Sequence, residues 1–196
     1  MKIGLFFGSF NPVHVGHLII AQHLVNQSDL DQVWMVVSPH NPLKEKAGLA
    51  NDHDRLYLVR LATENHPKIK ASSIEFGLPK PSYTVDTLAY LKEKYPDYSF
   101  SLIMGGDNLA GLHKWKNYKY LIDNYDIYVY KRPNAKLDDI EFDTSRVIFC
   151  DAPLLDISST MIRTMLAEGK SIQYFVPEVV YKELMKSSMY PKKKYS

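Results

Sequence analysis

Short apolar runs alternate with segments whose apolar residues recur at helical spacing, and this alternation constrains the fold more than any other feature. The runs are Lys2–Phe7, Gln32–Val37, Ile69–Ser73, Ser99–Met104, Asp126–Tyr130 and Arg146–Cys150. Their β-branched and aromatic residues are typical of buried strands. Strands that alternate with helices form a parallel sheet covered by helices. The sequence therefore predicts an α/β fold with a doubly wound, mainly parallel sheet.

The segments between the runs have apolar residues three or four positions apart, as one face of a helix requires. A short helix is expected to begin with Leu109, Leu112 and Trp115. Beyond residue 157 only helices are indicated. Ser158–Gly169 has a capping residue at each end, and Pro177–Ser188 places proline in a first turn. We expect a single domain over residues 1–196, with a sheet-containing core over 1–157 and a small helical part over 158–196.

Composition excludes several classes of protein. The chain has 196 residues, 45% of them hydrophobic, which is enough for one compact core. Its 24 basic and 22 acidic residues leave a net charge of +2, so a general nucleic-acid binder is not expected. No apolar segment is long enough to span a membrane, so no membrane partner is expected either. A homo-oligomer remains compatible with the sequence.

The chain has one cysteine, Cys150, which lies in the apolar run Val147–Cys150. A single cysteine cannot form an internal disulfide, and in such a run a small buried side chain is expected. This usage fits a reducing compartment, so we expect a cytoplasmic protein.

Ligands of open α/β sheets bind at the carboxyl ends of the strands. Four stretches follow predicted strands in this way: Gly8–His17, Ser38–Lys46, Gly105–Asp107 and Asp156–Arg163. The first reads G-S-F-N-P-V-H-V-G-H and lacks the G-x-G-x-x-G pattern of dinucleotide-binding proteins. In it, Gly8 and Ser9 are expected to let the backbone turn sharply.

His14 and His17 lie three residues apart at the expected start of the first helix, around Gly16, which admits a close neighbour. Three interpretations compete. A metal pair would need a third ligand, for which no motif is present. The histidines could also be incidental to a structural helix start. The third interpretation, a phosphate site, is favoured because a helix amino terminus attracts anions and imidazoles add donors.

The stretch D-I-S-S-T-M-I-R, Asp156–Arg163, crowds a helix start with hydroxyl groups. Arg163 comes three residues after Thr160, where its guanidinium can reach an anion at the same helix end. Taken alone, the stretch is equally well explained as a capped helix with a surface arginine. Together with the paired histidines it is far more specific.

H-x-G-H near the amino terminus and I-S-S-T-x-I-R near the carboxyl terminus resemble the motifs of the nucleotidyltransferase superfamily. "GGDNLAGLHKW" (Gly105–Trp115), "SYTVDTL" (Ser82–Leu88) and the closing "GKSIQYFVPEVVYKEL" are similar to segments of bacterial nicotinate-nucleotide adenylyltransferases. The resemblance covers nearly the whole chain. It implies a Rossmann-like fold and transfer of AMP from ATP to nicotinate mononucleotide, giving deamido-NAD and pyrophosphate in NAD biosynthesis.

The resemblance also implies roles for particular residues. The catalytic residues would be His14, His17, Lys44 and Arg163, with His40 and Lys46 as alternatives to Lys44. ATP would contact Gly8, Ser9, Phe10, His17, Gly105, Asp107, Arg132, Ile157, Ser158, Ser159 and Arg163. The mononucleotide would contact Lys44, Tyr83, Thr84, Asp107, Trp115 and Lys116.

These roles suit the chemistry of the side chains. The Trp115 ring could stack on the pyridine ring, unless it belongs to the core, and the helix start at Tyr83 and Thr84 could receive its carboxylate. Asp107 could accept hydrogen bonds from a ribose or cap a helix. No carboxylate pair suggests a protein metal site, so Mg²⁺ is expected to arrive bound to ATP.

Other activities remain open at this point. Nicotinamide mononucleotide and phosphopantetheine are alternative acceptors, although the second group usually has threonine where His14 stands. A nucleotide sensor that has lost catalysis is an alternative of a different class.

Overall fold

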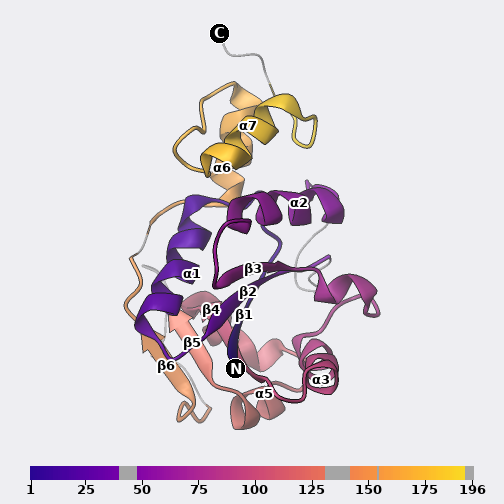
Figure 1. Ribbon diagram of the computed structural model, residues 1–196, viewed down its shortest axis with the longest axis vertical. Coiled ribbons are helices and arrows are strands. Elements are labelled where there is room, and N and C mark those ends of the chain that lie inside the picture. Colours follow the sequence, from indigo (N-terminus) through magenta and orange to yellow (C-terminus); the bar gives the residue numbers. More distant parts are fainter. Residues whose placement is uncertain (40–47, 131–141, 154, 193–196) are drawn as a thin grey trace.

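The computed structural model describes residues 1–39, 48–130, 142–153 and 155–192. Within them a parallel six-stranded sheet has the order β3-β2-β1-β4-β5-β6. The strands are β1 (Lys2–Gly8), β2 (Gln32–Val37), β3 (Ile69–Ser72), β4 (Ser99–Gly105), β5 (Ile127–Tyr130) and β6 (Val147–Cys150). The chain begins in the middle and winds outward in both directions (Figure 1). This order defines a Rossmann-like, doubly wound fold and confirms the predicted fold class.

Helices cover both faces of the sheet (Figure 1). One face carries α1 (Val15–Gln27) and α2 (Asp52–Thr63), and the other carries α3 (Thr84–Lys94) and α5 (Tyr118–Asn124). Shorter helices are η1 (Ile74–Gly77), α4 (Gly106–Ala110) and η2 (Leu112–Lys114). Because helices cover both faces, the sheet is buried on each side, as is usual for a parallel sheet.

The buried side chains form two clusters, one on each face of the sheet. Successive residues of a strand point to opposite faces. In β1, Ile3 and Leu5 therefore join the cluster under α3 and α5, whereas Phe6 joins the cluster under α1 and α2. Because both clusters use side chains of β1, this strand anchors both layers of helices and holds the loop that follows Gly8.

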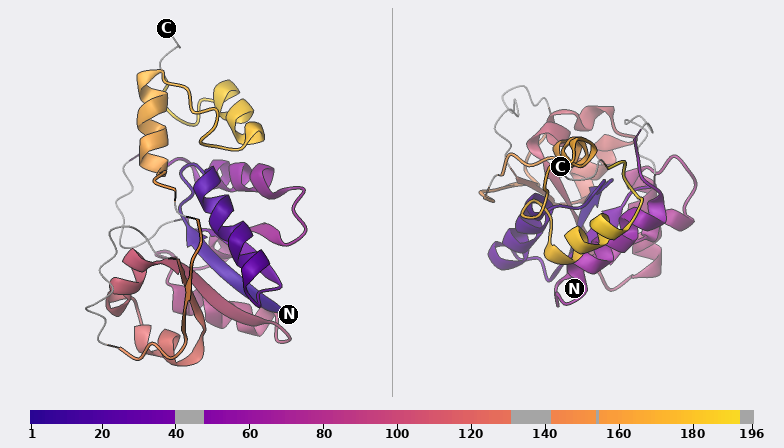
Figure 2. Two further views of the ribbon diagram at one scale, coloured as in Figure 1. Left: turned by 90° about the vertical axis from the view of Figure 1, so that its left-hand side faces the viewer. Right: turned by 90° about the horizontal axis from the view of Figure 1, so that it is seen from above.

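The carboxyl-terminal helices α6 (Ser159–Glu168) and α7 (Glu178–Lys186) stand beyond one end of the sheet, with α7 beside α2 (Figures 1 and 2). Ile162 and Val180 are fully buried in the same cluster as the apolar faces of α1 and α2. The Val15 N–H at the start of α1 donates to the Phe175 oxygen at 3.0 Å. The helical part thus packs directly onto the core.

The strands begin and end within one residue of the predicted bounds, but other local predictions were wrong. α5 was not predicted, and the helix expected near Leu109 is interrupted after Ala110, leaving Trp115 just beyond η2. Pro177 is the N-cap of α7 and not a residue of its first turn. Cys150 is half-buried and not fully buried, because β6 is an edge strand. No helix in the described residues is long and apolar enough to cross a membrane.

Candidate active site at the carboxyl ends of the strands

A cleft of about 470 Å³ opens at the carboxyl ends of β1, β4 and β5, beside the point where the strand order reverses. It brings together ten of the residues that the sequence predicted for the site. These are Gly8, Ser9, Phe10, His14, His17, Asp107, Ile157, Ser158, Ser159 and Arg163. The amino termini of α1 and α6 both supply residues to its wall, so two helix ends that favour anions meet there.

The loop after β1 turns at Phe10, whose φ of 44° lies in the left-handed region. We had expected Gly8 and Ser9 to make this turn. A left-handed conformation is unfavourable for a residue with a side chain and persists where the surroundings fix it. Phe10 is 1% exposed, and its ring packs edge-on against His17, with ring centres 5.0 Å apart. Burial of this ring therefore holds both the turn and the position of His17.

A buried arginine fixes the same loop from behind. Arg55 on α2 is fully buried and donates hydrogen bonds to the main-chain oxygens of Ser9 and Ser38 and to the Asp52 carboxylate. In a trans peptide the C=O and N–H groups point in opposite directions. Since the Ser9 oxygen is held toward Arg55, the N–H of Phe10 points away from α2. One guanidinium thus orients the main chain at the ends of both β1 and β2.

The two histidines form one unit. Their rings stack with centres 3.6 Å apart, and the His14 main-chain N–H donates to His17 Nδ1 at 3.2 Å. A nitrogen that accepts a hydrogen bond carries no proton, so neutral His17 has its proton on Nε2, where it can be donated to an anion. Gly16 makes room for this arrangement, because a Cβ there would lie 3.1 Å from His14 Nδ1.

The start of α6 is tied to the loop after β1. Ser158 caps the helix by accepting a hydrogen bond from the Met161 N–H at 3.1 Å. The Ser159 hydroxyl donates to the Pro12 oxygen at 2.9 Å, so it braces the loop. Arg163 donates from Nη1 to the Asn11 oxygen at 2.8 Å. Because a guanidinium has five N–H donors, this bond still leaves donors that can reach an anion in the cleft.

Asn11 is 5% exposed, and its side chain joins several segments of this region by hydrogen bonds. Its side-chain oxygen accepts hydrogen bonds from the Ala50 N–H at 3.1 Å and from the Tyr190 hydroxyl at 2.8 Å, and its amide donates to the Gly48 oxygen. Burial raises the pKa of Tyr190 well above its usual range, which keeps the hydroxyl a donor. The carboxyl-terminal segment is thereby joined to the loop that lines the cleft.

Four of the residues expected at the mononucleotide do not line the cleft and are described here as a second group: Tyr83, Thr84, Trp115 and Lys116. Tyr83 is the N-cap of α3, and Lys116 Nζ lies 4.7 Å from the centre of its ring. Lys116 also pairs with Asp86 at 2.8 Å. Trp115 and Tyr83 are half-buried against the cluster under α3, so Trp115 is partly a core residue. Thr84 is the first residue of α3.

Asp107 connects the two groups along the chain, because α4 carries it in the wall of the cleft and leads through η2 to Trp115. It is an exposed residue of the first turn, and the N-cap of α4 is Gly105, which does not line the cleft. A Cβ at Gly105 would lie 2.5 Å from Asp107 Oδ1, so glycine permits the position of this carboxylate.

Some expected residues fall outside the ranges given above. Lys44, its alternatives His40 and Lys46, and Arg132 are among them. In the ranges that the structure describes, no group of three or more His, Cys, Asp or Glu side chains could hold a metal ion.

Sequence reasoning missed Arg55, Asn11 and Tyr190. A signal existed for Arg55, because it precedes Val59 by four residues and so lies on the buried face of α2. A charged residue at an inward-facing position indicates a buried polar network. Tyr190 carried no such signal.

These observations define a class of protein. The cytidylyltransferase-like family model matches residues 5–165, and the chain belongs to this family of nucleotidyltransferases. Within it, the chain belongs with the nicotinate-nucleotide adenylyltransferases. It is 55% identical over 193 residues to a Flavobacterium psychrophilum protein named "Probable nicotinate-nucleotide adenylyltransferase", covering 98% of this chain and 100% of that one. A Bacteroides fragilis protein of the same name is 44% identical, with 95% and 92% covered.

A solved structure shares the fold. Nicotinic acid mononucleotide adenylyltransferase from Plasmodium falciparum, complexed with NaAD, superposes with a TM-score of 0.77 at 20% identity, with 94% of this chain and 95% of that one covered. The Rossmann-like fold predicted from the sequence is therefore confirmed by comparison as well as by strand order.

Proposed function

We propose that this protein transfers AMP from ATP to nicotinate mononucleotide, forming deamido-NAD and pyrophosphate in NAD biosynthesis. The observation that carries the proposal is that His17 and Arg163 line the same cleft, to which the amino ends of α1 and α6 both contribute. Relatives named for this activity, one of them matched over its whole length, support the same substrates. The single cysteine supports a cytoplasmic location.

The reaction needs no covalent enzyme intermediate. A phosphate oxygen of the mononucleotide attacks the α-phosphorus of ATP, a new P–O bond forms, and the bond to the β-phosphate breaks so that pyrophosphate leaves. Both reactants are anions, so the protein must hold them together and balance the charge that develops. The His17 Nε2 proton, the Arg163 guanidinium and the main-chain N–H groups of the loop after β1 are the donors suited to this work.

The second group of residues suits the mononucleotide. Trp115 offers a half-buried aromatic face to the pyridine ring, and the amino end of α3 at Tyr83 and Thr84 offers N–H groups to its carboxylate. Asp107, on the wall of the cleft, could accept hydrogen bonds from a ribose. Lys44 and Arg132 remain part of the proposal as contacts of phosphate and nucleotide.

Mg²⁺ is proposed to enter bound to the triphosphate. Asp107 is the single carboxylate among the described residues of the cleft wall, so most ligands of the ion would be phosphate oxygens and water. When bound, the ion would neutralise charge on the phosphates.

The test is release of pyrophosphate by the purified protein with ATP, Mg²⁺ and either nicotinate or nicotinamide mononucleotide. The proposal expects turnover with a higher kcat/KM for the acid. A preference for the amide would reassign the acceptor. Binding of ATP without turnover with either mononucleotide or with phosphopantetheine would indicate a nucleotide sensor instead.

A further inference from the structure

A carboxyl group is buried behind the amino end of α3, outside the cleft. Glu75 in η1 is 2% exposed, and its Oε1 lies 2.9 Å from the hydroxyl of Thr87, which is itself fully buried in the first turns of α3. Burial of an acidic side chain is rare unless a cation pairs with it. Among the described residues, no ion pair involves Glu75, and its Oε2 has no hydrogen-bond partner.

The hydrogen-bond contacts of the Thr87 hydroxyl indicate whether Glu75 is protonated or ionised. The Thr87 hydroxyl lies within hydrogen-bond distance of two oxygens, Glu75 Oε1 at 2.9 Å and the Tyr83 main-chain oxygen at 3.3 Å. A hydroxyl has one proton to donate. If Glu75 is protonated, it donates to Thr87 while Thr87 donates to Tyr83, and both contacts are satisfied. An ionised Glu75 would compete with Tyr83 for the single proton.

Burial supports the same conclusion. It raises the pKa of Glu75, with the hydroxyls of Ser38 and Thr87 acting in the opposite direction. A neutral Glu75 has a consequence for α3. A carboxylate on Thr87 would place a negative charge about one turn from the helix end, where it would repel an anionic ligand of the same N–H groups. In the neutral form that helix end keeps its attraction for anions.

We propose that Glu75, as a neutral acid hydrogen-bonded through Thr87 to Tyr83, is a positioning residue that sets the amino end of α3 to receive the carboxylate of the mononucleotide. The inference rests on the proposed function, since it concerns the same acceptor. Glu75 touches neither substrate. It acts through Thr87 on Tyr83 and Thr84.

The experiment compares E75L, E75Q and T87V with a matched control. E75L and T87V remove the contact between Glu75 and Thr87, whereas E75Q keeps a neutral group of the same shape that can both donate and accept. The control is E93L, which changes an exposed glutamate of α3, the helix that carries Thr87. Steady-state kinetics give KM for ATP and for each mononucleotide, calorimetry gives Kd for nicotinate mononucleotide, and thermal unfolding shows that each variant is folded.

E75L and T87V should raise KM and Kd for nicotinate mononucleotide about tenfold, with KM for ATP changed less than about twofold. KM for the amide should rise less than KM for the acid. E75Q and E93L should match the wild type, and E75L combined with T87V should be no worse than either alone, because both changes break one chain of hydrogen bonds.

Three results would overturn the inference while the wild type remains active. E75Q could behave as E75L does, which would require an ionised Glu75. E75L and T87V could leave KM for the mononucleotide unchanged, or they could raise both KM values equally, as a general loss of packing would. An inactive wild type contradicts the proposed function instead. If E75L does not fold, T87V still decides the question, because valine keeps the shape of threonine.

Discussion

Arg163 Nη1 donates a hydrogen bond to the main-chain oxygen of Asn11 at 2.8 Å, although 152 positions separate the two residues in the chain. The neighbouring bond from the Ser159 hydroxyl to the Pro12 oxygen runs between the same two segments. These two hydrogen bonds therefore fix the motifs from opposite ends of the sequence in position relative to each other. A change in either motif should affect how the other faces the cleft.

Replacing Arg163 with lysine tests this coupling. Lysine keeps the positive charge but has one donor nitrogen, so it cannot bond to the Asn11 oxygen and also align a second donor on a phosphate as arginine does. We expect kcat for pyrophosphate release to fall about 100-fold. R146K is the matched control, because Arg146 is an exposed arginine bonded to Asp126. Equal activity of R163K and the wild type would show that charge alone is needed.

His17→Ala removes the Nε2 donor from the cleft. The expected loss of turnover is about 10²- to 10³-fold, the range for removing one donor that stabilises a transition state. His23→Ala is the control on the same helix, since His23 lines a groove away from the cleft. Single-turnover measurements should place the loss in the chemical step. Unchanged turnover in folded H17A would remove His17 from the mechanism.

Arg55→Leu should destabilise the whole protein. It leaves the Asp52 carboxylate without its arginine and removes the donor from two partly buried main-chain oxygens, those of Ser9 and Ser38. We expect the free energy of unfolding to fall by about 3 kcal/mol, as when one partner of a buried pair is removed. Urea denaturation gives this quantity.

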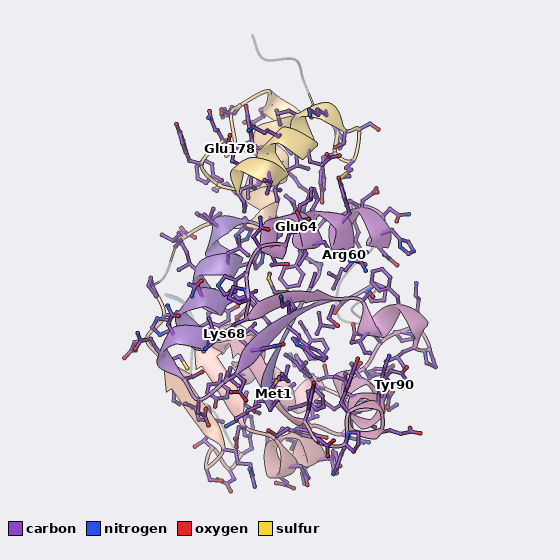
Figure 3. All side chains as sticks on the ribbon, viewed as in Figure 1. Met1, Arg60, Glu64, Lys68, Tyr90 and Glu178 are labelled. Carbon is purple, nitrogen blue, oxygen red and sulfur yellow. The ribbon has the colours of Figure 1, made fainter. Side chains whose placement is uncertain are left out.

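Arg60→Leu provides the control for that measurement. Arg60 lies on the same helix with its side chain exposed (Figure 3), so its loss should change stability by less than about 0.5 kcal/mol. Similar losses for R55L and R60L would mean that the network around Arg55 does not stabilise the fold.

Much of the fold was predictable because its signals are local. The apolar runs mark strands, and the rule that ligands bind at the carboxyl ends then gathers Gly8–His17 and Asp156–Arg163 at one edge of the sheet. Phe10 shows the limit of such reasoning. Its left-handed conformation is the opposite of what its residue type favours and exists because the ring is buried against Phe6 and His17.

The contacts of Arg55, Tyr190 and Glu75 could not be predicted for a related reason. Arg55 bonds to main-chain oxygens, Tyr190 to the side-chain oxygen of Asn11 and Glu75 to the Thr87 hydroxyl. In each case the partner lies on another segment, so the contact exists only after packing. The spacing of residues shows that Arg55 lies on a buried face of its helix, but it does not show which main-chain oxygens accept its hydrogen bonds. α5 escaped notice because Lys119 and Asp123 leave it a short apolar stripe.

The protonation state of Glu75 predicts a specific dependence of stability on pH. Burial raises its pKa in the folded protein above the ordinary value of 4.5. Below pH 4.5 both folded and unfolded chains are protonated at this position, and the contribution to stability is fully present. As the pH rises through the folded pKa, the unfolded chain has already lost the proton and the folded chain resists losing it, so the contribution is lost.

Glu75→Gln has no proton to lose. The free energy of unfolding of E75Q, minus that of the wild type, should therefore increase as the pH rises from 4.5, whereas the same difference for E93Q, which changes an exposed glutamate of α3, should show no such trend. Urea denaturation over this rise in pH measures the difference, and a difference that decreases with pH would mean that the fold stabilises the carboxylate.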